Sequence, residues 1–294
     1  MSLALYTRSC WLFDLDGTLV DSSAGVIRAF HRAQAEFGEA PADATAIRSR
    51  IGYPFEQTVA RLSAIPFSDF LTAFRREAMA NMHTDSFLLP GVRQLLHMLE
   101  LRGHRLAVVT SKRRDNAQQI LTHLGVSDCF EVIVGADSAA RIKPDPAPII
   151  AALTALGATL QETLMVGDTR NDIEAARAAE IPVIAVASGV DPGDRLADAD
   201  ECVADAASLL KRLVAAGREG GLLMYTAAYC SLCDELKDEL HHHRLRFTER
   251  DISTQPTWYR RYRERVPVVL DHTGREFDPP HTSERLTSWQ RDYG

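Results

Sequence analysis

The chain lacks the features of secreted, membrane-spanning and nucleic-acid-binding proteins. None of its apolar runs approaches the length of a membrane span, and Met1 to Ser9 have no signal-peptide pattern. Its five cysteines are an odd number without the spacing of a disulfide framework, which favours a reducing compartment. A net charge of −7 gives a nucleic-acid partner no electrostatic support. We therefore expect a soluble cytoplasmic protein with no nucleic-acid or membrane partner.

The most informative feature that is present is a predicted buried strand ending at two carboxylates. The apolar run Cys10–Phe13 leads into Asp14 and Asp16, which point the same way because strand side chains alternate with period two. Gly17 and Thr18 follow as a turn whose backbone amides can contact a phosphate. One carboxylate can attack, the other can donate a proton, and both can hold a divalent cation, as phosphoryl transfer through an aspartyl-phosphate requires. Two solvated acids before a turn are the alternative.

Polar side chains also follow three later segments, each where the chain leads into a predicted helix. They are Thr110 and Ser111 after the strand from Leu106, Lys143 in a proline-flanked loop, and Asp168 with Asp172 ahead of a helix from Ile173 to Ala179. In open α/β sheets, ligands bind outside the carboxyl ends of the strands. Acid, hydroxyl, amine and acid in this order therefore predict one shared site.

These positions closely resemble the four motifs of the haloacid dehalogenase superfamily of phosphohydrolases, over roughly residues 8 to 215. The resemblance implies that Asp14 is the nucleophile. Asp16 would be the general acid, and then the base that activates water on the phospho-aspartate. Thr110 and the Ser111 amide would hold phosphoryl oxygens, and Lys143 would offset the charge on nucleophile and phosphate.

The same resemblance implies a Mg²⁺ site formed by Asp14, Asp168 and the Asp16 backbone carbonyl, with Asp172 in close support. Hard oxygen ligands suit Mg²⁺, and such a site works mainly by positioning and by neutralising charge. The carboxylate of Asp16 favours a phosphate-ester phosphatase, because the dehalogenase and phosphonatase members of the superfamily lack an acid there. A sugar-phosphate mutase uses the same two acids and is an alternative.

An insert from residue 22 to 85 separates the first two motifs. Apolar residues at three-four spacing predict helices over Ala24–Phe37, Ala44–Arg50, Phe55–Ser63 and Phe67–Met82. In the resembled family an α-helical cap at this position closes over the site and selects the substrate, and excluding water strengthens the electrostatics. Gly52 and Tyr53 resemble the cap turn that faces the catalytic aspartate, with a plain helix-joining turn as the alternative. Arg48 and Arg50 flank this turn and could contact a substrate carboxylate.

The composition changes near residue 217, where glycines around charged residues predict the end of a helix and a linker. A strand at Leu222–Tyr225 follows, and then a Cys-x-x-Cys pair at a helix start. The remaining pattern predicts a strand, a helix, a proline-led strand, a short strand and a closing helix. This order resembles the thioredoxin and glutaredoxin fold over about residues 221 to 294.

The matching positions of this second resemblance are Cys230, Cys233 and Pro267. A helix N-terminus favours the Cys230 thiolate, and Cys233, one turn further on, can resolve a mixed disulfide. The resemblance makes Pro267 the cis proline beside the disulfide. A zinc half-site completed by His241–His243 is an alternative, although about 15 Å of helix separates the two ends. A plain structural pair of cysteines is another.

We therefore expect an α/β protein with a doubly wound Rossmann-like core at residues 8–21 and 86–216. A helical cap is expected at 22–85, a linker at 217–221, and a thioredoxin/glutaredoxin-like α/β domain at 222–294. The expected function is Mg²⁺-dependent hydrolysis of a small phosphorylated metabolite, with phosphoglycolate as the leading candidate. A thiol reductant is the expected partner of the second domain, whose Ser231 and Leu232 depart from the glutaredoxin pattern and leave glutathione binding open.

Two further hypotheses concern the relation between the halves. The chain could act mainly as a thiol-disulfide redox protein whose phosphatase-like half is auxiliary or sensory. Alternatively, the Cys-x-x-Cys pair could report redox state to the phosphatase, with Cys10, Cys129 and Cys202 as further thiols in the core. Buried free cysteines are more often inert packing residues.

Overall fold

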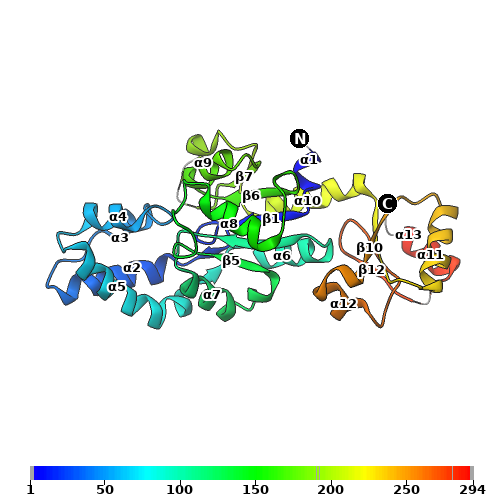
Figure 1. Cartoon of the computed structure of the whole chain (residues 1–294), viewed down its shortest axis with the longest axis horizontal. Coiled ribbons are helices and arrows are strands. Elements are labelled where there is room, and N and C mark those ends of the chain that lie inside the picture. The colour runs from blue at the N-terminus through cyan, green and yellow to red at the C-terminus, as the bar shows by residue number, and fades with distance from the viewer. Residues whose placement is uncertain (1–2, 190, 192, 280, 292–294) are drawn as a thin grey trace. The chain divides into compact units, whose positions relative to one another are not determined.

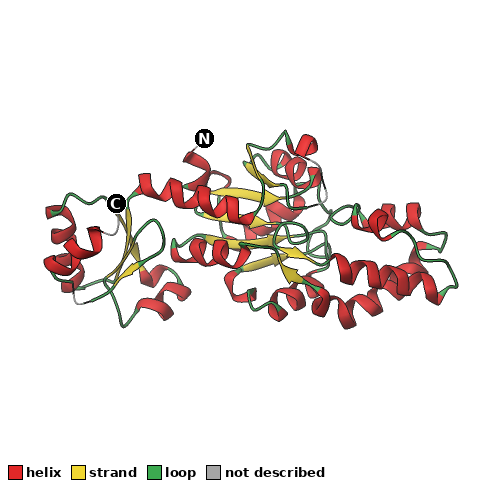
Figure 2. Cartoon of the chain, turned by 180° about the vertical axis from the view of Figure 1, so that it is seen from behind, coloured by secondary structure: helices red, strands yellow, loops and turns green. Residues whose placement is uncertain are grey.

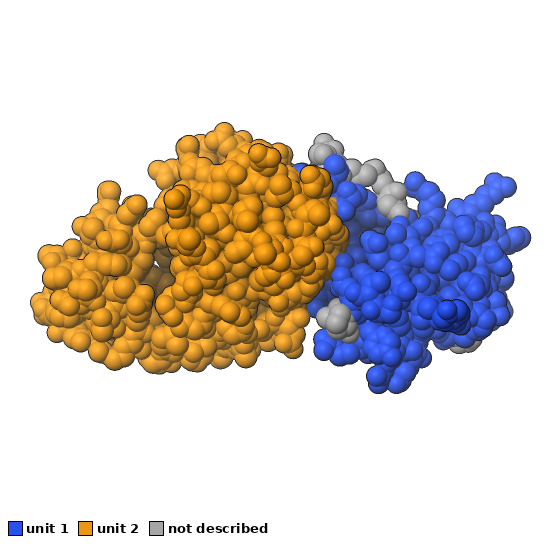
Figure 3. Space-filling model, in the orientation of Figure 1, with its two compact units in different colours: residues 1–7, 97–103, 210–294 blue, residues 8–96, 104–209 orange. Residues whose placement is uncertain are grey.

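The computed structural model describes residues 3–189, 191, 193–279 and 281–291. It divides the chain into two compact units, shown in different colours in Figure 3. The larger unit comprises residues 8–96 and 104–209, and the smaller unit comprises residues 1–7, 97–103 and 210–294.

The larger unit is built on a parallel sheet with the strand order β5-β4-β1-β6-β7-β8 (Figure 1). The strands are β1 (Cys10–Phe13), β4 (Arg105–Val109), β5 (Val132–Val134), β6 (Thr163–Gly167), β7 (Val183–Val186) and β8 (Glu201–Val203). The helices that follow them are α7 (Arg114–His123), α8 (Ala147–Leu156), α9 (Arg170–Ala178) and α10 (Ala206–Gly220), and α6 (Val92–Leu101) precedes β4.

Helices cover both faces of this sheet (Figure 2), so its central strands are buried runs of apolar residues rather than alternating ones. On one face, Cys10 and Leu12 share a core with Ile149 of α8 and Ile173 of α9. Trp11 and Phe13 alternate with them and face the other way. This arrangement confirms the doubly wound core that the sequence predicts.

The register of the sheet brings the strand ends together. Phe13, the last residue of β1, lies opposite Val108 of β4 and Val166 of β6. The Asp14 amide donates to the Val166 carbonyl at 2.9 Å, which continues the pairing by one residue. Asp14, Thr110 and Asp168 therefore follow neighbouring strands at one edge of the sheet.

A helical cap is inserted between β1 and β4. It consists of α2 (Ser23–Glu36), α3 (Ala44–Arg48), α4 (Phe55–Leu62) and α5 (Phe67–Asn81). The chain enters it through β2 (Val20–Asp21) and leaves through β3 (Phe87–Leu88), which pair antiparallel. The cap has its own buried core of Phe30, Ile47, Val59, Phe70 and Ala73. The four helices predicted for the insert are confirmed, with ends that differ by at most two residues.

The smaller unit contains a four-stranded mixed sheet with the order β10-β9-β11-β12. Its elements after α10 are β9 (Leu222–Thr226), α11 (Ser231–His242), β10 (Phe247–Asp251), α12 (Pro256–Tyr262), β11 (Val268–Leu270), β12 (Glu276–Phe277) and α13 (Ser283–Arg291). β10 is parallel to β9, whereas β11 is antiparallel to both β9 and β12. This is the order and pairing of the thioredoxin and glutaredoxin fold, as the sequence predicts.

Short elements complete the secondary structure. They are α1 (Leu3–Tyr6) and the 3-10 turns η1 (Met82–Asp85), η2 (Ser127–Cys129), η3 (Leu160–Glu162), η4 (Gly193–Leu196) and η5 (Ile252–Thr254).

The predicted end of a helix at Gly217 is wrong, because α10 continues through this residue to Gly220. A Cβ atom at position 217 would lie 2.1 Å from Arg102 Nη2. Arg102 donates to the Leu213 carbonyl at 2.6 Å and so lies along the helix surface. Glycine at this position leaves room for the close approach of Arg102, although glycine costs about 1 kcal/mol in a helix. Of the predicted linker, Gly221 alone lies beyond the helix.

Candidate active site

A buried lysine joins two of the predicted acids. Lys143 Nζ lies 2.5 Å from Asp14 Oδ1 and 2.6 Å from Asp172 Oδ1, and it donates to the Val109 carbonyl at 2.8 Å. The Lys143 side chain is only 2 % exposed. Burial opposes its charge, but the attraction of both carboxylates outweighs burial and raises the pKa of Lys143. This amine is therefore a fixed cation at the end of β1.

Asp14, Asp168 and Asp172 form a buried acid cluster whose members each offer an oxygen within 4.8 Å of the others. Burial raises the pKa of Asp14 to about 7 against the opposing effect of Lys143, and nearby carboxylates raise it further. Burial and the Asp14 charge also raise the pKa of Asp168 well above its usual value. Three acids beside one lysine leave negative charge uncompensated, which is the environment that a divalent cation requires.

The two carboxylate oxygens of Asp168 differ in their contacts. Its Oδ1 accepts from the Thr18 hydroxyl at 2.9 Å, whereas its Oδ2 is buried without a hydrogen-bond partner among the described residues. Gly17 has a φ of +89°, and a Cβ there would lie 2.2 Å from this Oδ2. The turn thus requires glycine both for its backbone conformation and for the close carboxylate. The chemistry of this buried carboxylate oxygen fits coordination of a metal ion.

Asp172 is more fully engaged than the other two acids. Its Oδ1 accepts from Lys143, and its Oδ2 accepts from the Thr169 amide at 3.0 Å and hydroxyl at 2.7 Å. These contacts with Thr169 form the capping box at the start of α9. Asp172 therefore orients Lys143 and the helix start, and both of its oxygens already have partners.

Asp16 forms a second ion pair, with Lys112. Its Oδ2 is 3.1 Å from Lys112 Nζ, and its Oδ1 accepts from the Ser22 hydroxyl. Both side chains of the Asp16–Lys112 pair are 9 % exposed. The sequence prediction assigned no role to Lys112, although it follows Ser111 directly at the end of β4. Its position after a strand end was the available signal.

The predicted phosphate-binding residues differ in whether their polar groups already form hydrogen bonds within the protein. Ser111 Oγ is buried without a partner among the described residues, which leaves it free to contact a ligand. Thr110 Oγ1 accepts from the Lys112 amide at 3.1 Å. The Gly17 amide donates to the Val20 carbonyl at 2.8 Å, so it serves the turn rather than an anion. Thr18 likewise holds Asp168 through its hydroxyl.

The cap turn at Gly52 and Tyr53 contacts the core. The Tyr53 hydroxyl lies 2.7 Å from both carboxylate oxygens of Asp191, which is 6 % exposed and also accepts from the Arg170 amide at 2.9 Å. Burial and this hydrogen bond raise the pKa of Tyr53 to about 12. The sequence prediction missed Asp191. Its position in the loop after β7 was the available signal, because ligands bind outside the carboxyl ends of the strands in open α/β sheets.

A cavity of about 400 Å³ extends from Asp14 and Asp16 to the cap interior. Asp14, Asp16 and Thr110 line it on the core side, and Gly52 and Tyr53 line it on the cap side. The structure thus brings the predicted cap turn and three of the predicted catalytic residues to one cavity of the larger unit, whereas Lys143 lies outside this lining and contacts Asp14.

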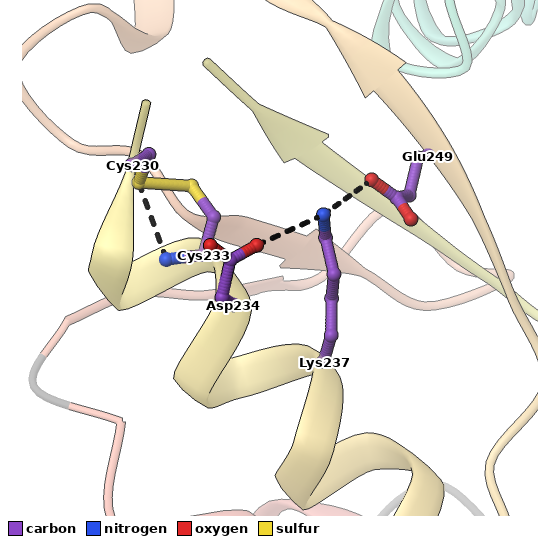
Figure 4. The surroundings of a disulfide bond; sticks show 5 residues. All are labelled: Cys230, Cys233, Asp234, Lys237 and Glu249. Carbon is purple, nitrogen blue, oxygen red and sulfur yellow. Dashed lines mark hydrogen bonds and ion pairs between the residues drawn. A yellow bond between two sulfur atoms is a disulfide. The ribbon is translucent and has the colours of Figure 1, made fainter. Parts of the chain in front are cut away.

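In the smaller unit, Cys230 and Cys233 are joined by a disulfide at the start of α11 (Figure 4). The Cys233 amide donates to Cys230 Sγ at 3.2 Å, and the peptide bond before Pro267 is cis. Cys230 is half-buried, whereas Cys233 is buried. The disulfide argues against the zinc alternative, and among the described residues the acid cluster is the one group placed to hold a metal.

Two family models match the chain, one over most of the core and cap and one over the C-terminal domain. A model of the haloacid dehalogenase-like hydrolases matches residues 11–186, and the chain belongs to this family. A model of a glutaredoxin-like domain (DUF836) matches residues 221–290, so the chain also carries such a domain. The larger unit is therefore an enzyme of the phosphatase class, as the sequence resemblance implies.

Individual relatives resemble the larger unit. The phosphoglycolate phosphatase of Yersinia pestis is 37 % identical over 200 residues, covering 65 % of this chain and 86 % of that protein. The phosphoglycolate phosphatase of Colwellia psychrerythraea is 32 % identical over 203 residues, covering 65 % and 90 %. A crystal structure of a predicted phosphoglycolate phosphatase from Haemophilus somnus aligns with a TM-score of 0.63 and 28 % identity, covering 70 % of this chain and 98 % of that chain.

Within the described residues, no helix is both long and apolar enough to cross a membrane.

Proposed function

We propose that the larger unit hydrolyses a small phosphate monoester through an aspartyl-phosphate on Asp14. The observation that carries the proposal is the buried arrangement of Asp14, Lys143 and Asp168 beside a cavity that also reaches Asp16. Asp14 is held against Lys143, which offsets negative charge as the carboxylate approaches a phosphate. The unpartnered hydroxyl of Ser111 and the presence of Thr110 in the cavity lining support contacts of both residues with phosphoryl oxygens.

The proposed reaction has two steps. Asp14 attacks phosphorus, the bond to the ester oxygen breaks, and Asp16 donates a proton to the leaving alkoxide. Asp16, now a carboxylate, accepts a proton from water as that water attacks the phosphorus of the aspartyl-phosphate. Inorganic phosphate leaves and Asp14 is regenerated. The contact between Tyr53 and Asp191 holds the cap turn to the core, which supports exclusion of bulk water during the first step.

Asp14 and Asp168 would hold a Mg²⁺ ion together with the Asp16 backbone carbonyl. When bound, the ion would neutralise charge on the phosphate and the carboxylates. The unpartnered Asp168 Oδ2 supports this assignment. Asp172 would support it from outside the ligand set, because both of its oxygens are engaged.

Phosphoglycolate is the first substrate to test, since similar enzymes carry that name. The experiment measures phosphate release from phosphoglycolate, sugar phosphates, nucleotides and pyrophosphate, with Mg²⁺ and with EDTA. Asp14→Asn is the control. Release that persists in Asp14→Asn refutes the mechanism, and interconversion of sugar phosphates without phosphate release favours a mutase.

A second proposal concerns the smaller unit, which we assign to thiol-disulfide exchange. In the reduced form, the Cys230 thiolate attacks a partner disulfide and releases one partner thiolate. Cys233 then attacks the Cys230 sulfur of the mixed disulfide, which re-forms the internal disulfide and releases the second partner thiolate. A thiol reductant returns the pair to the reduced form. The half-buried Cys230 at a helix start, with a backbone N–H directed at its sulfur, supports the order of attack.

Cys230→Ser tests this second proposal, because disulfide reduction that persists in the variant refutes it. Loss of exchange together with unchanged phosphate release would separate the two activities.

We also propose the division into a core at 8–21 and 86–216, a cap at 22–85 and a redox domain from 222 onward, which limited proteolysis tests. Three cysteines, Cys10, Cys129 and Cys202, lie outside the disulfide and support a cytoplasmic location, which cell fractionation tests.

A further inference from the structure

The active-site cavity has an apolar part formed by the cap. Besides the acids, its lining includes Phe55, Phe67, Leu71 and Phe74, from α4 and α5. The ring of Phe55 lies 4.4 Å from that of Phe74 and 6.3 Å from that of Phe67, measured between ring centroids. These rings form a continuous aromatic wall on the cap side of the cavity.

The aromatic wall is not covered by the protein itself. Phe55, Phe67 and Phe74 pack against the buried cap core, yet each remains half-buried rather than buried. Leu71 is half-buried as well and lies outside that core cluster. Uncovered apolar surface inside a cavity is stabilised when an apolar group displaces water from it, by roughly 25 cal/mol per Å². The wall therefore matches an apolar part of a ligand.

The size of the cavity leads to the same conclusion. About 400 Å³ lies within the range of roughly 300–1,000 Å³ that is typical of sites for drug-sized ligands. Phosphoglycolate is a two-carbon acid and would leave the aromatic wall in contact with water. A larger organic group reaches the wall while its phosphate lies at Asp14.

Arg50 adds a positive charge to the same lining. Its guanidinium lies over the Tyr53 ring, 5.9 Å from the centroid. Its Nε is buried, and among the described residues the side chain makes no hydrogen bond or ion pair. By contrast, Lys112 and Arg113 of the same lining are paired with Asp16 and Asp115, and Arg75 is exposed to solvent. Arg50 is thus an uncompensated cation in the cavity, and an acidic group of a ligand would satisfy it.

We propose that the substrate is a phosphate monoester of an acidic alcohol that carries a bulky apolar group. The phosphate contacts Asp14, the apolar group contacts the wall formed by Phe55 and Phe74, and the acidic group contacts Arg50. This inference rests on the proposed function, and it makes phosphoglycolate a minimal analogue that lacks the apolar group. The wall and Arg50 determine specificity rather than perform chemistry.

Three esters with similar aliphatic leaving groups test the proposal. Phosphoglycolate has the acid without the apolar group, 2-phenylethyl phosphate has the apolar group without the acid, and 2-phosphooxy-3-phenylpropanoate has both. We expect kcat/KM for the last ester to exceed that for each of the others by about tenfold or more, since one hydrophobic group in a fitted pocket contributes about that factor. A higher kcat/KM for phosphoglycolate overturns the proposal.

Variants with matched controls assign the effect to the cavity. Leu71→Gln should lower kcat/KM for 2-phosphooxy-3-phenylpropanoate about tenfold and leave that for phosphoglycolate within about twofold. Leu62→Gln is its control, because Leu62 packs against the same cap core without lining the cavity. Arg50→Gln should lower kcat/KM for the two acidic esters and leave 2-phenylethyl phosphate unchanged. Arg48, which the sequence also suggested as a carboxylate contact, is exposed, lies 3.9 Å from Asp21 and does not line the cavity. Arg48→Gln is therefore the control.

The outcomes separate this inference from the proposed function. Asp14-dependent hydrolysis of phosphoglycolate in preference to the phenyl-bearing esters refutes the inference and supports the proposed function. Equal losses for all three esters in Leu71→Gln and Leu62→Gln also refute it, because the effect would then come from cap stability. Absence of phosphate release from every ester, or release that persists in Asp14→Asn, refutes the proposed function itself.

Discussion

Lys143→Met removes the cation that holds two acids of the buried cluster, and we expect a large, pH-dependent loss of stability. Lys143 contacts Asp14 and Asp172 at 2.5 and 2.6 Å and is 2 % exposed. Methionine fills a similar volume without charge, so the substitution tests charge rather than packing. Removing one partner of a buried ion pair costs about 3–5 kcal/mol, because the remaining charge is left uncompensated.

The expected loss depends on pH in a definite direction. The pKa of Asp14 is about 7 in the folded protein, and removing Lys143 removes an effect that lowers it. A carboxyl group whose pKa is higher in the folded than in the unfolded protein stabilises the folded state. This contribution is fully present below the pKa of the unfolded protein, near 4, and is lost as the pH rises through the pKa of the folded protein. The destabilisation by Lys143→Met should therefore be larger at about pH 8 than at about pH 5.

The assay is urea unfolding of the larger unit in EDTA at these two pH values. Arg61→Met is the control, because Arg61 is an exposed residue of the same unit and its replacement should change stability by about 0.5 kcal/mol or less. Saturating Mg²⁺ should restore part of the loss, by about 2.7 kcal/mol at a hundred times its dissociation constant. Equal destabilisation at both pH values, or a loss below about 1 kcal/mol at the higher pH, would refute the reasoning about the acid cluster.

Three further predictions follow from the same geometry. In EDTA, the unfolding free energy of the unmodified protein should fall as pH rises from about 4 to about 7, because the folded pKa of Asp14 is raised; a rise in urea titrations contradicts this. Tyr53→Phe removes a hydrogen bond to the buried Asp191 and should raise KM more than it lowers kcat, by a factor equivalent to about 1–3 kcal/mol in steady-state kinetics; an unchanged KM contradicts it. Cys230→Ser should abolish disulfide exchange and leave phosphate release unchanged, and parallel loss of both activities contradicts the separation of the two sites.

Much of the site could be predicted because strand ends in parallel sheets share one edge. The apolar run Cys10–Phe13 indicates a buried strand, and period-two alternation places Asp14 and Asp16 on the same side of it. Pairing of β1 with β4 and β6 then brings the ends of three strands together. Local sequence patterns thus predict the strand ends, and parallel pairing of the strands brings the side chains that follow them to one edge.

The partners of these residues could not be predicted, because they depend on loop conformation. The Gly17 amide donates to Val20 within its own turn, and Asp172 divides its oxygens between Lys143 and Thr169. The contact of Tyr53 with Asp191 joins residues separated by 138 positions. Sequence periodicity specifies faces and ends of elements, whereas these hydrogen bonds depend on how the cap and loops meet.

Gly217 shows the same limit for element boundaries. Glycine predicts the end of a helix because it costs about 1 kcal/mol in a helix interior. The close approach of Arg102 supplies a reason for glycine within α10 that only the folded structure reveals. The helices of the cap, by contrast, have strong apolar periodicity and were predicted nearly to the residue.

The most direct test of the central claim is to trap the covalent intermediate. Asp16→Asn removes the proposed acid and base, and acetyl phosphate has a leaving group that needs no protonation. With this donor and Mg²⁺, phosphorylation should proceed while hydrolysis of the aspartyl-phosphate stalls. Mass spectrometry after an acid quench should find one phosphoryl group on the peptide that contains Asp14, and none in Asp14→Asn with Asp16→Asn. A phosphoryl group on another residue, or turnover of acetyl phosphate without any on Asp14, would contradict the account.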